Sequence, residues 1–329
     1  MKLTDKLRHL WRSSAGGQTA VSPTPDRTNV PETVRPRVLM INHDPLIPFD
    51  GGRRLHEVLH WHDPSALAQQ YISDVEAASY GYAKYQIVER LDVDQFPVKA
   101  DGFRYDAESY LYRWRSRTGF HYPDQLDYGR LLQQHNIPAR INAGQIDEVW
   151  LFGFPYAGYY ESVMVGPEAF WCNAPPIEQA ECKRRFVIMG FNYERGVGEM
   201  LENLGHRTES IMAQVYRRKR GEANLWERFT RYDKTHPGQA ECGNVHFAPN
   251  SERDYDWGNG RFVRSLCDDW FNFPNFQGVS RRVNCEEWGN GDIRYHHLWW
   301  LGHMPHINGK TGGILNNWWA YIIDPNLVR

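Results

Sequence analysis

The sequence lacks a net charge of either sign, a long apolar run and a paired-cysteine motif, and each absence excludes a class of protein. With 38 lysines and arginines against 40 acidic residues, the formal net charge is -2, which provides no broad field for a nucleic acid. No stretch reaches the roughly 20 apolar residues that cross a bilayer, and no apolar leader follows the first residues. The five cysteines are odd in number and show no C-x-x-C spacing, so we expect a cytoplasmic protein without a disulfide framework.

Motifs that identify common cofactor and catalytic sites are also missing where they would be expected. The stretch Asn42 to Gly52 has a glycine pair but no G-x-G-x-x-G and no following G-K-[ST], so the pair is expected to form a turn before a helix. Ser162 lies in neither a G-x-S-x-G elbow nor an S-x-x-K motif. The zinc helix H-E-x-x-H and the zinc-deaminase pattern are absent. Candidate chemistry therefore rests on the clustering of residue types.

The chain divides into three parts by composition. Residues 1–36 contain a short basic amphipathic stretch at 2–12 and then a Ser, Thr, Pro and Gly-rich stretch, and we expect a disordered N-terminal segment. The basic stretch predicts either a frayed terminal helix or a helix that docks on a membrane surface or a partner. The folded part is expected to begin near Arg37.

Residues 37–225 alternate between strand-like and helix-like patterns. Short apolar runs, each followed by a loop with Gly, Pro or Asn, occur at 38–41, 85–89, 146–152 and 185–190. This alternation predicts an α/β domain with a mainly parallel sheet and flanking helices. Ligands bind outside the carboxyl ends of such strands, which directs attention to the loops at 42–52, 153–172 and 192–198.

Residues 226–329 have a different composition. They hold eight of the thirteen tryptophans, many Asn, Gly and Asp residues, and few long apolar repeats. We expect this part to be a loop-rich, aromatic-rich cap packed on the α/β core.

One predicted helix, residues 197–215, places acidic and imidazole side chains on one stripe. At 100° per residue, Glu199, Glu202, His206 and Glu209 fall opposite the apolar face. Helical spacing of Glu and His is used by metal sites, so His206 and Glu209 are predicted metal ligands and Glu199 a candidate general base. A solvated helix face shows the same pattern, and Gly205 is consistent with a helix stop at this point.

The run DIRYHHLWWLGHMPH, residues 292–306, holds four of the fourteen histidines. Gly302 and Pro305 argue against one continuous helix through its end, and the metal signal lies in the density of histidines, not in their spacing. His297 and His303 are the predicted ligands that join His206 and Glu209 around a divalent ion, zinc, manganese or iron. His296 is a candidate for acid-base work. The alternative is that these histidines are core residues with backbone partners.

Further candidates come from the loops. Glu161 is a candidate acid or base, although a carboxylate at a helix start is an equally simple interpretation. Cys172 fits a small buried hydrophobe better than a nucleophile. Tyr156, Asn250, Asp256 and Trp299 are candidate substrate-binding residues, because aromatic faces beside amides and carboxylates suit sugar-like ligands. The same residues are also common as turn formers and core aromatics.

These features together predict a hydrolase that acts on a polar small molecule or a carbohydrate-like substrate. Its His/Glu site, with a divalent metal in the more specific version, is expected between the α/β core and the C-terminal cap. Two alternatives stay open: a metal-free acid-base enzyme acting on a carbohydrate, and a non-catalytic protein that binds a glycan or a metabolite. No nucleic-acid partner and no transmembrane segment are expected.

Overall fold

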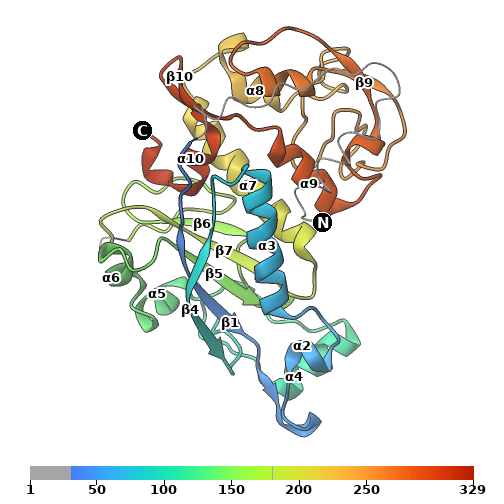
Figure 1. The fold of residues 1–329 in the computed structure, drawn as a ribbon. Helices are drawn as coiled ribbons and strands as arrows, with labels where there is room; N and C mark the ends of the chain where they lie inside the picture. The colour runs from blue at the N-terminus through green and yellow to red at the C-terminus, as the bar shows by residue number, and fades with distance from the viewer. Residues whose placement is uncertain (1–30, 180) are drawn as a thin grey trace.

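The computed structural model describes residues 31–179 and 181–329. Its centre is a five-stranded sheet with the order β4-β1-β5-β7-β6, seen near the middle of Figure 1. All neighbouring strands are parallel except β6, which runs antiparallel to β7. The strands are β1 (Arg37–His43), β4 (Gln86–Val93), β5 (Glu148–Gly153), β6 (Ser162–Val165) and β7 (Phe186–Asn192). The prediction of an α/β fold with a mainly parallel sheet is thus confirmed.

Each predicted strand is present, and one strand of the five-stranded sheet, β6, was missed. The apolar runs at 38–41, 85–89, 146–152 and 185–190 correspond to β1, β4, β5 and β7, with ends that differ by a few residues. Strand β6 lies in the stretch treated as a loop, because its four residues are too few to show a periodicity. All four are buried at the edge of the sheet.

Helices cover both faces of the sheet, and the alternation of side chains along β1 decides which face each residue supports. On one face, Met40 of β1 packs in a cluster with α3 (Pro64–Ala78) and α7 (Val197–Tyr216). On the other, Leu39 and Ile41 pack in a separate cluster with α5 (Tyr128–Gln134) and α6 (Ile137–Asn142). Helix α7 continues through Gly205 without a break, so the alternative of a helix stop at this residue is wrong.

A buried ion pair fixes α7 to the sheet. The Arg207 guanidinium lies 2.8 Å from the Glu148 carboxylate of β5, and both side chains are almost completely buried. Arg207 also donates a hydrogen bond to the carbonyl of Ile322. The nearby Trp150 indole and Tyr85 hydroxyl donate to the same carboxylate. Helix α7 therefore has a defined position relative to both the sheet and the C-terminal part of the chain.

Short elements connect the larger ones. A small hairpin of β2 (Leu46–Ile47) and β3 (Arg53–Arg54) follows β1, with the 3-10 turn η2 (Pro48–Asp50) at its tip, and α2 (Leu55–Val58) comes next. Helix α4 (Ala107–Ser116) lies between β4 and α5 in the sequence. In Figure 1 the hairpin and α4 lie at the bottom, away from the C-terminal part of the chain at the top.

The last third of the chain consists of short helices, ribbons and loops. In order they are η3 (Gly221–Ala223), α8 (Leu225–Phe229), β8 (Val263–Ser265), η4 (Cys267–Asn272), β9 (Arg281–Val283), η5 (Cys285–Trp288), α9 (Ile293–Gly302), β10 (His306–Thr311), β11 (Ile314–Asn317), α10 (Trp318–Ile323) and η6 (Pro325–Leu327). All eight tryptophans from Trp226 onward are buried, in the same hydrophobic cluster that includes α3 and α7. These aromatic rings serve as core.

Helix α9 packs against both α7 and α3. Arg294 forms a two-pronged ion pair with the buried Asp74 of α3, with both N···O distances at 2.8 Å. A Cβ added to Gly198 of α7 would lie 2.4 Å from the Ile293 side chain, so the two helices approach closely because this position is glycine.

The predicted N-terminal segment lies mostly outside the described residues, including the basic stretch at 2–12. Within the described part, Val34 forms backbone hydrogen bonds with Tyr82 and Lys84, so the packed structure begins a few residues before Arg37. In the part of the chain that the structure describes, every helix is too short or too polar to span a bilayer.

Candidate metal centre

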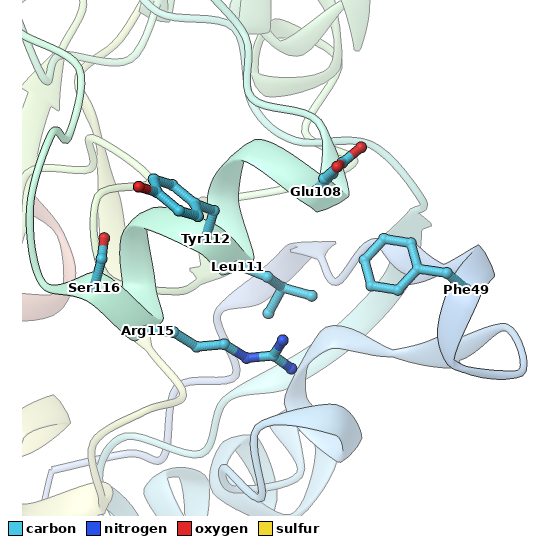
Figure 2. A pocket seen from close by; sticks show the side chains of 6 residues that line it. All are labelled: Phe49, Glu108, Leu111, Tyr112, Arg115 and Ser116. Carbon is cyan, nitrogen blue, oxygen red and sulfur yellow. The ribbon is translucent and has the colours of Figure 1, made fainter.

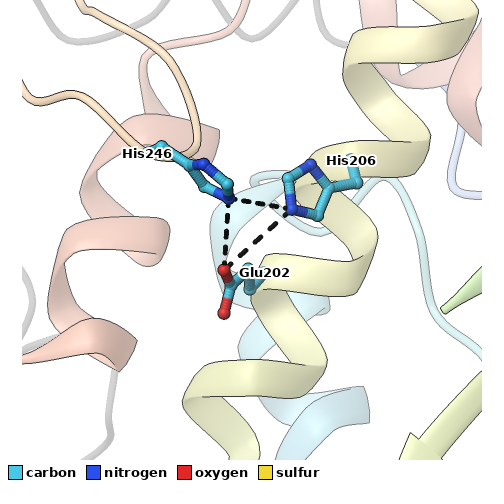
Figure 3. Close-up of side chains that lie close together, drawn as sticks. All are labelled: Glu202, His206 and His246. Atoms are coloured by element: carbon cyan, nitrogen blue, oxygen red, sulfur yellow. Dashed lines mark hydrogen bonds and ion pairs between the residues drawn. The ribbon is translucent and has the colours of Figure 1, made fainter. Parts of the chain in front are cut away.

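Three metal-ligating side chains meet between α7 and the loop that joins α8 to β8. Glu202 and His206 lie one turn apart on α7, and His246 reaches them from the loop (Figure 3). The Nε2 atoms of the two histidines are 3.2 Å apart. The Glu202 carboxylate lies 3.4 Å from the Nε2 of His246 and 4.0 Å from that of His206. Three donor atoms therefore converge on one point.

These separations match what one ion requires. Ligands about 2.0 to 2.1 Å from a tetrahedral zinc ion lie about 3.3 Å from one another. The His206 to His246 and His246 to Glu202 distances are close to this value, and a small rotation of a side chain brings the third pair into range. Two histidines and one carboxylate are also the ligand set of many catalytic zinc sites, in which a fourth position stays open.

Each histidine is held from behind by a carboxylate. The Nδ1 of His206 lies 3.2 Å from Glu209, and the Nδ1 of His246 lies 3.0 Å from Asp254. A carboxylate at Nδ1 fixes the ring orientation and directs the Nε2 lone pair toward the centre, as the outer partners of metal-bound histidines do. The three side chains could therefore hold a metal ion, with a carboxylate behind each histidine.

Glu209 also positions the loop that carries His246. One of its oxygens contacts His206, while the other accepts a hydrogen bond from the backbone N–H of Val245. The loop can come this close because Gly205 has no side chain: a Cβ there would lie 2.6 Å from a methyl of Val245. The glycine that made the helix prediction uncertain thus allows the loop to contact α7.

Glu161 approaches the cluster from the sheet edge. It immediately precedes β6, and its carboxylate lies 4.0 Å from the Nε2 of His206 with about half of the side chain exposed. The amide of Asn173 donates a hydrogen bond to it. The interpretation of Glu161 as a helix-start carboxylate is wrong, because a strand follows it.

Ser162 and Cys172 are buried next to each other. The Ser162 hydroxyl donates a hydrogen bond to the Cys172 carbonyl, and burial raises the pKa of the Cys172 thiol to about 11.

Tyr255 closes the cluster on its exposed side. Its hydroxyl donates a 2.9 Å hydrogen bond to Glu202 and lies 3.0 Å from the Nε2 of His246. Burial of the hydroxyl and the Glu202 carboxylate raise the pKa of Tyr255, although the ring itself is 51% exposed. At neutral pH this hydroxyl is therefore a hydrogen-bond donor beside the three ligand atoms, not a base.

The surroundings favour positive charge at this point. Burial acts to raise the pKa of Glu202, but hydrogen bonds from His246 and Tyr255 outweigh it and the pKa lies below its ordinary value. Burial acts to lower the pKa of His206, and Glu209 outweighs it, so that pKa is raised. The hydrogen bond to Glu202 raises the pKa of His246. The lowered pKa keeps a negative charge on Glu202 that a cation could balance, and the raised pKa values reflect carboxylates that favour positive charge at both rings.

His297 of α9 adds a third imidazole beside the cluster of Glu202, His206 and His246. It is fully buried, its Nδ1 lies 2.7 Å from the Ile293 carbonyl, and its Nε2 has no hydrogen-bond partner among the described residues. Burial lowers its pKa to about 4, against the nearby Glu202 carboxylate, which acts to raise it. His297 is therefore a neutral imidazole with a free lone pair at Nε2, the form that a metal ligand or a base requires.

The other predicted histidines lie elsewhere in the fold. His296 is buried and stacks on Trp257, with ring centroids 4.8 Å apart, and burial lowers its pKa well below the ordinary value. His303 belongs to a second group with Cys267 and Asp268. There Arg281 forms an ion pair with Asp268 and burial raises the pKa of the Cys267 thiol, so this group offers less negative charge to an ion.

The remaining predicted residues have local structural partners. Glu199 accepts a hydrogen bond from the Gly196 backbone at the start of α7. The Asn250 amide donates to the carbonyls of Asn259 and Arg261. Asp256 accepts from the Glu252 backbone. Both thereby shape the loop that presents Tyr255.

Two aromatic candidates for substrate binding are also engaged with neighbours. Tyr156 stacks on Phe120 with ring centroids 3.5 Å apart and is 40% exposed. Trp299 is buried against Trp288. Neither is among the side chains that contact the Glu202, His206 and His246 cluster.

His246 and Tyr255 are side chains of the candidate site that sequence reasoning did not select. They come from an irregular loop, where no periodicity links a histidine to a distant helix. The sequence does contain one signal for this loop. His246, Asp254 and Tyr255 lie within ten residues of one another, so the stretch is rich in side chains that can bind a metal or donate a hydrogen bond.

Comparisons with known proteins provide no relative. No family model matches the chain, and neither the curated proteins nor the solved structures include a significant match. The functional argument therefore rests on the geometry of the cluster.

Proposed function

We propose that this chain is a divalent-metal-dependent hydrolase that acts on a polar small molecule, with Glu202, His206 and His246 as the ligands of the ion. One observation carries this proposal: three donor atoms converge within 4.8 Å of one another, while a carboxylate holds each histidine at its other nitrogen. The outer carboxylates support a metal site over a chance cluster, because they fix the ring orientation that coordination needs.

A bound ion would supply Lewis-acid activation of water and polarise the group to be cleaved. The protein provides the proton transfers around it. Glu161, half exposed at 4.0 Å from the His206 ring, is placed to accept a proton, and Asn173 orients its carboxylate. Tyr255, protonated at neutral pH, is placed to donate a hydrogen bond to a developing negative charge.

His297 completes the inventory of the site. Its unpartnered Nε2 makes it a candidate for a further ligand to the ion or a hydrogen-bond acceptor for substrate. The tryptophans of residues 226–329 are buried, so they offer no aromatic platform for a sugar, whereas Tyr255 beside the cluster is exposed. The substrate class is therefore a polar small molecule, of which a carbohydrate-like compound is one example.

All five cysteines are unpaired, which supports a reducing compartment such as the cytoplasm.

The test is a turnover screen on the metal-loaded protein with esters, amides, phosphate esters and glycosides. We expect activity that is lost in His246→Ala and Glu202→Gln, because each removes one ligand, and that persists in His303→Ala, which changes a histidine outside the cluster. Glu209→Gln should weaken metal binding by roughly 10- to 100-fold, as the loss of an outer partner does.

Two outcomes would replace this proposal with one of its alternatives. Turnover that survives complete removal of metal by a chelator would identify a metal-free acid-base enzyme. Stoichiometric metal binding without turnover of any substrate class, combined with saturable binding of a glycan or metabolite, would identify a binding protein.

A further inference from the structure

A second site is indicated at the carboxyl ends of β1 and β4. After β1 the chain continues to α3 on one face of the sheet, and after β4 it continues through α4, which packs in the same cluster as α3, to α5 and α6 on the opposite face. The two strands are neighbours in the sheet. Ligands of open α/β sheets bind outside the carboxyl ends of the strands, so a binding pocket is expected at this end of the sheet.

A pocket of about 420 Å³ occupies this position. His43, the last residue of β1, and the segment from Val93 to Val98 after β4 form one side, and α5 with the adjacent His135 forms the other. Its size is that of a small-metabolite site. Apolar side chains and the amides of Gln95, Gln133 and Gln134 both contribute to the lining, so the pocket offers hydrogen bonds as well as contact area.

The charged groups of the pocket are mainly cationic. Arg104 and Arg130 supply two positive charges, and Asp127 is its one acidic lining residue. A carboxylate oxygen of Asp127 already accepts the backbone N–H of Arg130 at the start of α5. In residues 31–179 and 181–329, neither arginine has an ion-pair partner, and the one side-chain bond that Arg104 makes is to the neutral Gln95 amide. Two guanidinium groups are thus available for an anion.

The pocket also has a buried polar group at its base. His43 is 6% exposed, and its Nδ1 lies 2.6 Å from the Tyr159 hydroxyl. This contact fixes the ring while the residue still lines the pocket. A ligand in the pocket would therefore meet exposed arginines at the rim and a fixed imidazole at the end of β1.

We propose that this pocket binds a small metabolite through an oxyanion group, a phosphate or a carboxylate, which pairs with Arg104 and Arg130. Guanidinium groups bind such anions through paired, charge-assisted hydrogen bonds. The site is separate from the metal centre, because none of its lining residues belongs to the Glu202, His206 and His246 cluster. The bound metabolite is either a second substrate or an effector of the protein.

A second pocket of similar size provides a matched control. It has about 380 Å³ and lies between α4 and the tip of the β2–β3 hairpin, lined by Phe49, Leu111, Tyr112 and Ser116 with one acid, Glu108, and one arginine, Arg115 (Figure 2). The opposite charges of Glu108 and Arg115 leave it no net charge. An arginine-to-glutamine change here removes the same charge from the protein without touching the proposed site.

The experiment is isothermal titration calorimetry of the full chain with inorganic phosphate, ribose 5-phosphate and succinate. We expect saturable binding of at least one probe. Arg104→Gln and Arg130→Gln should each weaken it by about tenfold or more, since each removes a charge-assisted hydrogen bond. Arg115→Gln should leave the affinity within about twofold of the unchanged protein. Both arginines are exposed, and circular dichroism checks that the variants keep their fold.

The probes also assign the chemistry of the ligand. Preference for ribose 5-phosphate over succinate identifies a phosphate ligand, and the reverse identifies a carboxylate; both support the site. Absence of binding for all three probes at millimolar concentration overturns the proposal. Binding that is unchanged in both arginine variants, or that is lost in His246→Ala alone, also overturns it, because the anion would then be bound elsewhere.

Discussion

Alteration of Glu148 should destabilise the contact between the sheet and α7, the helix that carries Glu202 and His206. Its carboxylate balances the fully buried Arg207 of α7 at 2.8 Å and accepts hydrogen bonds from Trp150 and Tyr85. The substitution Glu148→Gln keeps the size of the side chain and part of the hydrogen bonding but removes the negative charge. Arg207 would stay charged even without the raising effect of Glu148, because the ordinary pKa of an arginine lies far above neutrality.

The expected cost is that of a buried charge left without its partner, about 3 to 5 kcal/mol of the free energy of unfolding. At about 2.1 cal/mol/K of unfolding entropy per residue, a chain of 329 residues loses about 1.5 °C of melting temperature for each kcal/mol. We therefore expect Glu148→Gln to lower the melting temperature by about 4 to 7 °C in differential scanning calorimetry.

The matched control is Glu76→Gln, which removes a carboxylate from the exposed ion pair with Lys84 at 2.9 Å. Exposed pairs contribute about 1 kcal/mol or less, so this variant should melt within about 2 °C of the unchanged protein. Equal effects of the two substitutions, or a loss below about 1 kcal/mol for Glu148→Gln, would refute the view that the buried pair holds α7 on the sheet.

Two further predictions concern the loop contact and the dependence of stability on pH. Gly205→Ala should push Val245 and the metal-binding loop away from α7 and lower metal affinity by about tenfold or more. Gly129→Ala in α5, where an added Cβ meets no atom closer than 3.5 Å, should leave metal affinity unchanged, and equal affinities in both variants would contradict the contact. Burial lowers the pKa of His43 from 6.5 to about 3, so the unfolded chain binds its proton first and stability falls as pH drops from about 6.5 toward 3. Chemical denaturation of His43→Gln should show a loss between pH 7 and 4.5 that is smaller by about 2 to 3 kcal/mol, and an unchanged pH dependence would refute this assignment.

The fold could be predicted where the sequence has continuous apolar runs. Strands β1, β5 and β7 are almost entirely buried, and the mostly exposed β4 contains a shorter apolar run, so composition located all four. Strand β6 has four residues and no alternation, and its pairing with β7 depends on tertiary contact. The C-terminal part was expected to be loop-rich and aromatic, but the sequence could not show that its tryptophans would be buried in the core.

The candidate site was predictable only on the side contributed by α7. The helical spacing of Glu202, His206 and Glu209 placed these residues on one stripe, and the structure keeps them together. The histidines of residues 292–306 are distributed by the geometry of α9 and the turn after it. His297 lies near the cluster, while His303 lies in the group with Cys267 and Asp268. Of the three proposed ligands, His246 is the one that does not come from α7. Its position depends on how a long irregular loop folds back, which local sequence patterns do not encode.

The most direct test of the central claim is a calorimetric titration of the metal-free protein with zinc, on the unchanged chain and on His246→Ala. The account predicts about one bound ion per chain, with an affinity at least about a hundredfold lower in the variant, because one of three inner ligands is lost. Binding below about 0.2 equivalents, with no gain for manganese or iron, would contradict the metal centre. Equal affinities for the two proteins would contradict the assignment of His246 as a ligand.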